Sequence, residues 1–100
     1  MLVFDFNKAM AQVNELRQIA SDMNRMKNSV LAEAISGVQA GWQGQTAQQF
    51  LSKCNNLKEL IVKEVRNIET VADSLERTAK IIEAAEREAI RIATTGLVRQ

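Results

Sequence analysis

The stretch Gly37-Val38-Gln39-Ala40-Gly41-Trp42-Gln43-Gly44 decides the fold, because it holds three of the four glycines of this 100-residue chain and its only tryptophan. Glycine adopts backbone conformations that other residues avoid, so a cluster of glycines marks a place where a chain reverses direction. The chain has no proline, and its fourth glycine, Gly96, lies near the end of the sequence. The sequence therefore predicts two long uninterrupted segments joined by one turn.

Both long segments carry apolar residues three and four positions apart, the spacing that places side chains on one face of a helix. Neither shows the sustained alternation of a strand. We predict an all-α chain forming a single domain over residues 1–100. Its parts are a helix over about 7–37, a turn over about 38–45, a helix over about 46–94 and a frayed tail over 95–100. The tail is expected because Gly96 is a natural helix stop.

Helix-capping residues stand near both predicted helix starts. Asp5 or Asn7 is expected to cap the first helix, since both residue types are favoured at that position. Thr46 and Gln49 have the spacing of a capping box for the second helix.

The two predicted helices differ in length, at about 45 Å and about 75 Å, and together they bury only one seam. One seam is too little core for a domain of this size. We therefore expect two antiparallel hairpins to pack into a four-helix bundle, which makes the protein a dimer. The candidate core and dimer residues share the apolar faces of the two helices: Val13, Leu16, Met23, Val30, Phe50, Cys54, Leu57, Ile61, Ile68, Val71 and Leu75.

Composition excludes several functions. The 13 basic and 12 acidic residues give a net charge of +1 without a basic patch, which argues against nucleic-acid binding and a polybasic membrane anchor. The chain has no histidine and one cysteine, so histidine triads, histidine-containing zinc sites and an internal disulfide are impossible. We expect Cys54 to pack as a small apolar residue. We expect no cofactor, metal, small-molecule substrate or enzymatic activity, because no set of titratable groups converges in a cleft.

The segment Gly41-Trp42-Gln43-Gly44, followed by Ala47 and Phe50, resembles the WXG signature of the hundred-residue proteins exported by type VII (ESX) secretion systems, the early-secreted-antigen-like family. The resemblance covers essentially the whole chain. It implies a leaderless protein that is made in the cytoplasm and secreted, as a helical dimer recognised by an FtsK-like motor ATPase. No signal peptide and no membrane span is expected from the sequence.

The same family carries a carboxy-terminal export element, ordinarily Tyr-x-x-x-Asp/Glu in a hydrophobic and acidic helical pattern. The resemblance places Glu86 in the acidic position and Ile82 where the tyrosine would stand, although this chain has no tyrosine. In the family, Trp42 of one protomer would lie near this element of the other.

Other functions stay open at this point. With the same fold, the chain could be an export partner that pairs with another family member or with the helical amino-terminal region of a larger effector or toxin. It could also be a coiled-coil adaptor with an accidental WXG match. A membrane-lytic helix is disfavoured because the polar faces mix both signs of charge.

Overall fold

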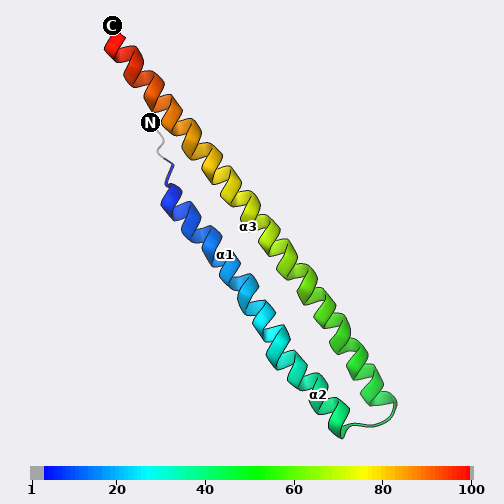
Figure 1. Cartoon of the computed structure of the whole chain (residues 1–100). Coiled ribbons are helices and arrows are strands. Elements are labelled where there is room, and N and C mark those ends of the chain that lie inside the picture. Colours follow the sequence, from blue (N-terminus) through cyan, green and yellow to red (C-terminus); the bar gives the residue numbers. More distant parts are fainter. Residues whose placement is uncertain (1–3, 100) are drawn as a thin grey trace.

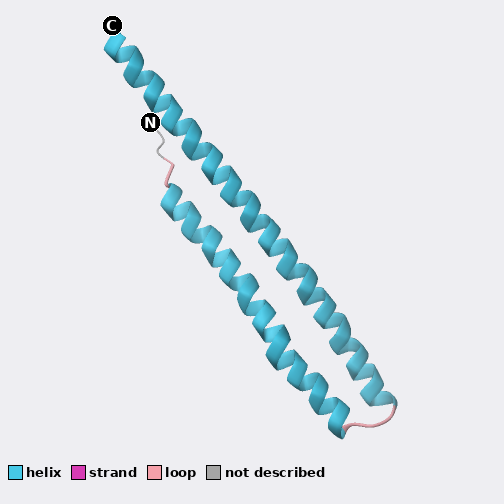
Figure 2. Ribbon diagram, viewed as in Figure 1, coloured by secondary structure: helices cyan, strands magenta, loops and turns pink. Residues whose placement is uncertain are grey.

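A computed structural model describes residues 4–99 as one long helical hairpin (Figure 1). The first arm consists of α1 (Phe6–Met26), a π-helical turn η1 (Lys27–Leu31) and α2 (Ala32–Gly41), and α3 (Gln45–Arg99) runs back beside it. The described part of the chain is helical apart from the segment before α1 and the connection after α2 (Figure 2), so the all-α prediction is confirmed. The hairpin measures 85 × 15 × 15 Å.

The turn is shorter than the sequence predicts. The first arm continues through Gly37 to Gly41, and α3 begins at Gln45. Continuing the helix buries Val38 against α3, which offsets the cost of about 1 kcal/mol for a helical glycine. Gly44 has a φ of +86° and is the only residue with positive φ among the described residues. The reversal therefore needs glycine at one position rather than three.

Two further predictions about helix ends need correction. The predicted cap Thr46 already lies inside α3, and the Gln48 N–H donates to the Gly44 carbonyl. The second helix does not end near 94 but continues through Gly96 to Arg99, and Gln100 lies outside the described residues. The prediction for Asp5 is confirmed, because its Oδ1 accepts the Lys8 N–H at 2.9 Å and caps α1.

The core is a narrow seam between the two arms. Leu31, Cys54 and Ile61 form its central cluster, with Met23 and Val65 packed beside them. Toward the open end of the hairpin, where α1 begins, the buried residues become small. The buried seam residues among those described are Val13, Ala20, Leu31, Val38, Ala47, Cys54, Ile61, Ala72 and Ala79.

The π-helical turn η1 shifts the register of the first arm. A π-turn holds one residue more than an α-turn, so the residues after it advance by one position relative to the seam. As a result Leu31 is buried, while Val30, the predicted core residue just before it, is 63% exposed. Ile35 and Val38 face the seam in the same way, in place of Ala34 and Gly37.

Candidate functional site

The turn motif forms an aromatic surface at the closed end of the hairpin. Trp42 follows α2 in an extended conformation, and its backbone N–H donates to the Val38 carbonyl at 2.9 Å. The Trp42 ring lies 5.3 Å from the Phe50 ring at an interplanar angle of 43°. Trp42 is nevertheless 51% exposed, and Gly41 and Gly44 beside it are exposed too. The tryptophan is thus held by one aromatic neighbour but stays accessible to a partner.

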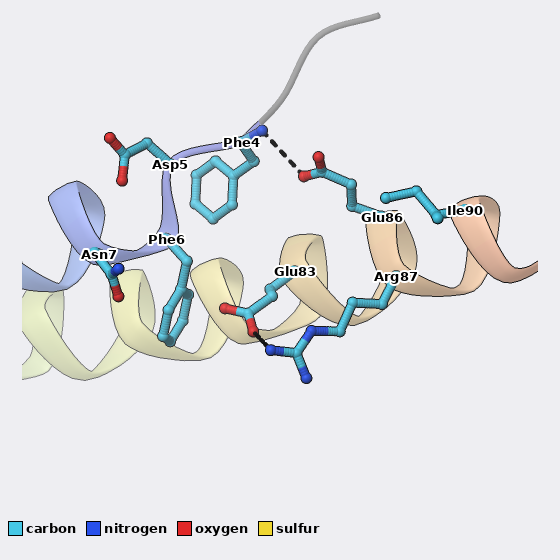
Figure 3. A pocket seen from close by; sticks show the side chains of 8 residues that line it. All are labelled: Phe4, Asp5, Phe6, Asn7, Glu83, Glu86, Arg87 and Ile90. Carbon is cyan, nitrogen blue, oxygen red and sulfur yellow. Dashed lines mark hydrogen bonds and ion pairs between the residues drawn. The ribbon is translucent and has the colours of Figure 1, made fainter.

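The predicted export element lies at the opposite, open end. Ile82 is 40% exposed on α3, and Glu86 is half-buried one turn later. The Glu86 carboxylate is not free, because its Oε2 accepts the backbone N–H of Phe4 at 3.0 Å (Figure 3). Sequence periodicity could not reveal this contact, which joins residues 82 positions apart.

The two predicted recognition elements do not meet within one chain. Trp42 precedes α3, whereas Glu86 lies forty-one residues beyond Gln45, the first residue of α3. At about 1.5 Å per helical residue, the two elements lie roughly 60 Å apart along the hairpin. A surface composed of both needs two chains.

Charged side chains surround the open end. Glu83 Oε1 pairs with Arg87 at 2.6 Å, while its Oε2 is buried without a hydrogen bond (Figure 3). One turn further, both Glu88 oxygens accept from Arg91 at 3.0 and 2.6 Å. These bonds lower the pKa of Glu88 and raise that of Arg91. This part of α3 therefore carries closely spaced, mutually bonded charges of both signs.

A polar bridge that the sequence analysis missed crosses the seam nearby. Arg17 donates to Glu76 Oε1 at 2.8 Å and to Asp73 Oδ1 at 3.1 Å, and Lys80 holds the other Glu76 oxygen at 3.1 Å. The hydrogen bond from Arg17, followed by that from Lys80, lowers the pKa of Glu76. The signal in the sequence was the position of Arg17, a lone charge directly after Leu16 on the apolar face.

The structure divides the predicted core and dimer residues into two groups. Val13, Cys54 and Ile61 are buried, and Leu16, Met23 and Ile68 are half-buried in the seam between the arms. The remaining residues are exposed on the hairpin: Val30, Phe50, Leu57, Val71 and Leu75.

The described residues contain neither a candidate metal site nor a candidate membrane-spanning helix. Between residues 4 and 99, no three cysteine or carboxylate side chains are grouped so that they could hold a metal ion. None of the helices in that range combines the length and the apolar character that crossing a membrane requires. Cys54 is a free, buried thiol in the central cluster.

Comparison with known protein families gives a match. The family model WXG100, described as proteins of 100 residues with WXG, matches residues 7–87. The matched range includes the turn motif and both residues of the predicted export element. No curated protein and no solved structure matches the chain.

Proposed function

The chain belongs to the WXG100 family, since the family model matches residues 7–87, and we propose from this that it is exported as a dimer by a type VII secretion system. Members of this family are small helical proteins secreted by type VII systems, and they are not enzymes. The proposal adds three finer points: two copies pair, a motor ATPase recognises the pair, and export needs no cleaved signal peptide. The observation that carries the proposal is an apolar stripe left exposed on the hairpin.

On α3 this stripe follows the seam with a constant offset. Each of its residues stands three positions after a buried or half-buried seam residue: Phe50 after Ala47, Leu57 after Cys54, Val71 after Ile68, Leu75 after Ala72 and Ile82 after Ala79. Three residues correspond to about 300° of helical rotation, so the stripe runs along α3 about 60° to one side of the seam. We call these five residues the outer stripe.

The first arm contributes to the same face. Ile19, Met26 and Val30 are exposed, and each directly precedes a residue that faces the seam. One residue back along a helix corresponds to about −100°, and three residues forward correspond to about −60°. Relative to the seam residues, both sets are therefore displaced in the same rotational sense. Because the arms run antiparallel, offsets in one sense place both sets on one face of the hairpin.

A second copy of the chain suits this face. The outer stripe extends over about 48 Å of α3, long enough for a specific interface of roughly 1,600 Å². Antiparallel pairing of two hairpins would also carry Trp42 of one copy toward Glu86 of the other, which the roughly 60 Å between them prevents within one chain. We propose that the motor ATPase recognises the resulting surface, which combines Trp42 of one copy with Glu86 and Ile82, the end residue of the outer stripe, of the other.

A second candidate role keeps the fold and changes the partner. The chain has no tyrosine, so Ile82 occupies the place of the usual export tyrosine. This absence favours a role as an export partner that pairs with another family member or the helical amino-terminal region of an effector, which then supplies the complete signal.

Pairing is tested with two valines on opposite faces of the hairpin. Val71 lies in the outer stripe and is 51% exposed, whereas Val62 follows buried Ile61 directly and lies on the other face at 36%. We expect Val71→Glu to abolish pairing in light scattering after size exclusion, and Val62→Glu to leave a two-chain mass. A one-chain mass of the unaltered protein would refute the homodimer and favour the export-partner role.

Export is tested in the cells that make the protein. We expect it in the culture supernatant when the motor ATPase is present and only in the pellet when the motor is deleted. Glu86→Gln is expected to reduce export without changing the mass of the dimer. Supernatant levels that do not depend on the motor would refute the proposed function.

A further inference from the structure

The segment before α1 crosses to the export element instead of extending along the hairpin. Asp5 caps the start of α1 by accepting the Lys8 N–H, and its backbone (φ −87°, ψ 88°) turns the chain away from the helix axis. Phe4 then lies over α3, where its N–H donates to Glu86 Oε2 (Figure 3). We call Phe4 and Asp5 the amino-terminal strap.

The strap lies beside both residues of the export element. On one side, the Phe4 side chain borders an apolar hollow of about 210 Å³ that is also lined by Val13, Leu75 and Ile82. On the other side, Phe4 and Asp5 border an open hollow of about 720 Å³ together with Glu86 and Ile90 (Figure 3). Phe4 therefore borders one hollow with Ile82 and another with Glu86, and it is itself half-buried.

The strap also contacts the groups of the export element that a partner would bind. A carboxylate is recognised by hydrogen-bond donors, and one Glu86 oxygen already holds the Phe4 N–H. Ile82 is the apolar residue of the export element, and Phe4 lines the same hollow. A protein that binds Ile82 and Glu86 from outside must compete with the strap for both.

We propose that the amino-terminal strap masks the export element of the free protein and is displaced when the secretion machinery binds it. The proposal rests on the proposed function, because it assigns a regulator to the same Ile82–Glu86 surface. One hydrogen bond to a charged acceptor and one aromatic ring hold the strap. Such a contact sustains a ratio of closed to open states on the order of tenfold, which a binding partner can overcome.

The strap can be removed without disturbing the helix that follows. Phe4→Ala deletes the ring, and Phe4→Pro deletes both the ring and the N–H donor. Both substitutions leave the cap between Asp5 and Lys8 in place, so we expect unchanged helicity and a melting temperature lowered only by the loss of the strap contact itself. Leu60→Ala serves as a control, since it removes an exposed apolar side chain from α3 away from the strap.

Carboxyl footprinting tests the masking directly. The purified proteins are labelled with a carbodiimide and an amine probe, and modification is read by mass spectrometry at Glu86 and at the exposed Glu69. We expect Glu86 labelling to rise in both Phe4 variants, while Glu69 labelling stays constant and Leu60→Ala changes neither. Equal Glu86 labelling in all proteins would overturn the proposal.

Export in the producing cells tests the consequence. We expect motor-dependent export of the Phe4 variants to rise severalfold, up to about the tenfold ratio of the closed strap. If the unaltered protein is exported but the Phe4 variants are exported equally or less, the strap proposal fails while the proposed function stands. If no protein reaches the supernatant, the proposed function fails, and the strap proposal fails with it.

Discussion

Deleting Ser29 tests whether the π-helical turn exists to correct the register of the seam. Ser29 is an exposed residue of η1. Because a π-turn holds one residue more than an α-turn, removing it allows a continuous α-helix in which Leu31, Ile35 and Val38 keep their places on the seam. We expect the free energy of unfolding to stay within about 1 kcal/mol of that of the unaltered chain.

The structure gives the size of the loss of apolar burial that the π-turn prevents. If the unaltered segment were a regular α-helix, Val30, Ala34 and Gly37 would take the seam places of Leu31, Ile35 and Val38. Together these three side chains have about seven fewer carbon atoms, which corresponds to roughly 5–6 kcal/mol at full burial. Since Ile35 is only half-buried, about 4 kcal/mol is the better figure. That difference explains why a rare helical turn is maintained here.

The control is a deletion of the same size in α1. Removing the exposed Gln18 rotates the residues that follow by about 100°, so that Ser21 and Asn24 replace Ala20 and Met23 on the seam. We expect a loss of about 3 kcal/mol from the lost apolar contacts and the buried amide. Denaturant unfolding followed by circular dichroism, at one fixed protein concentration, measures both variants. A Ser29 deletion as destabilising as the Gln18 deletion would refute the register argument.

Three further predictions concern stability. Ile61→Ala, in the central cluster, should cost about 2–5 kcal/mol in denaturant unfolding, and a smaller loss would mean that the seam collapses around the cavity. Gly37→Ala should raise the melting temperature, because Gly37 is helical with open space around it, whereas Gly44→Ala, at a φ of +86°, should lower it. Arg17 holds the pKa of Glu76 below its ordinary 4.5, so the stability from this bridge is present above pH 4.5 and lost as the pH falls through the lower folded value. Arg17→Met should therefore lose less stability between pH 6 and 3 than the unaltered protein, and equal losses would contradict the bridge.

Helical periodicity predicts which residues are apolar and helical, but it does not say which neighbour they face. The sequence placed Cys54, Leu57, Ile68 and Val71 on one heptad seam. In the structure, Cys54 and Ile68 face the first arm, while Leu57 and Val71 lie exposed on the outer stripe. A helix that packs against a single neighbour uses only part of a heptad stripe. The same period fits a broad face that serves two neighbours, so the sequence alone could not separate them.

The helix ends were predicted less well, because the free-energy cost of a glycine inside a helix is small compared with the gain from burying an apolar side chain. Gly37 was expected to end the first helix, yet one more turn buries Val38 and the helix continues. A penalty of about 1 kcal/mol is smaller than the gain from burying a valine, about 1.5–3 kcal/mol. A positive φ, found at Gly44, is the stronger constraint, because few other residues tolerate it.

Contacts between distant segments could not be predicted, because they depend on how far one arm slides along the other. Periodicity fixes the face on which Arg17 lies, but not that Asp73 and Glu76 stand level with it. The same offset sets Phe4 level with Glu86. Both contacts follow from the length of the first arm measured from the turn at Gly44, and the extra residue of η1 enters that length.

The thin seam connects the fold to the proposed function. Toward the open end, Val13 is the one large side chain among the buried residues described, and the rest of the seam there is built from Ala20, Ala72 and Ala79. Small side chains let the arms approach closely but bury little apolar area, and stability scales with that area. The exposed outer stripe holds larger side chains than this part of the seam does. A second chain packed on it would complete a core that one hairpin only begins. In the proposed pair, folding and pairing would be coupled, and the same event would bring the distant turn motif and export element of two chains together.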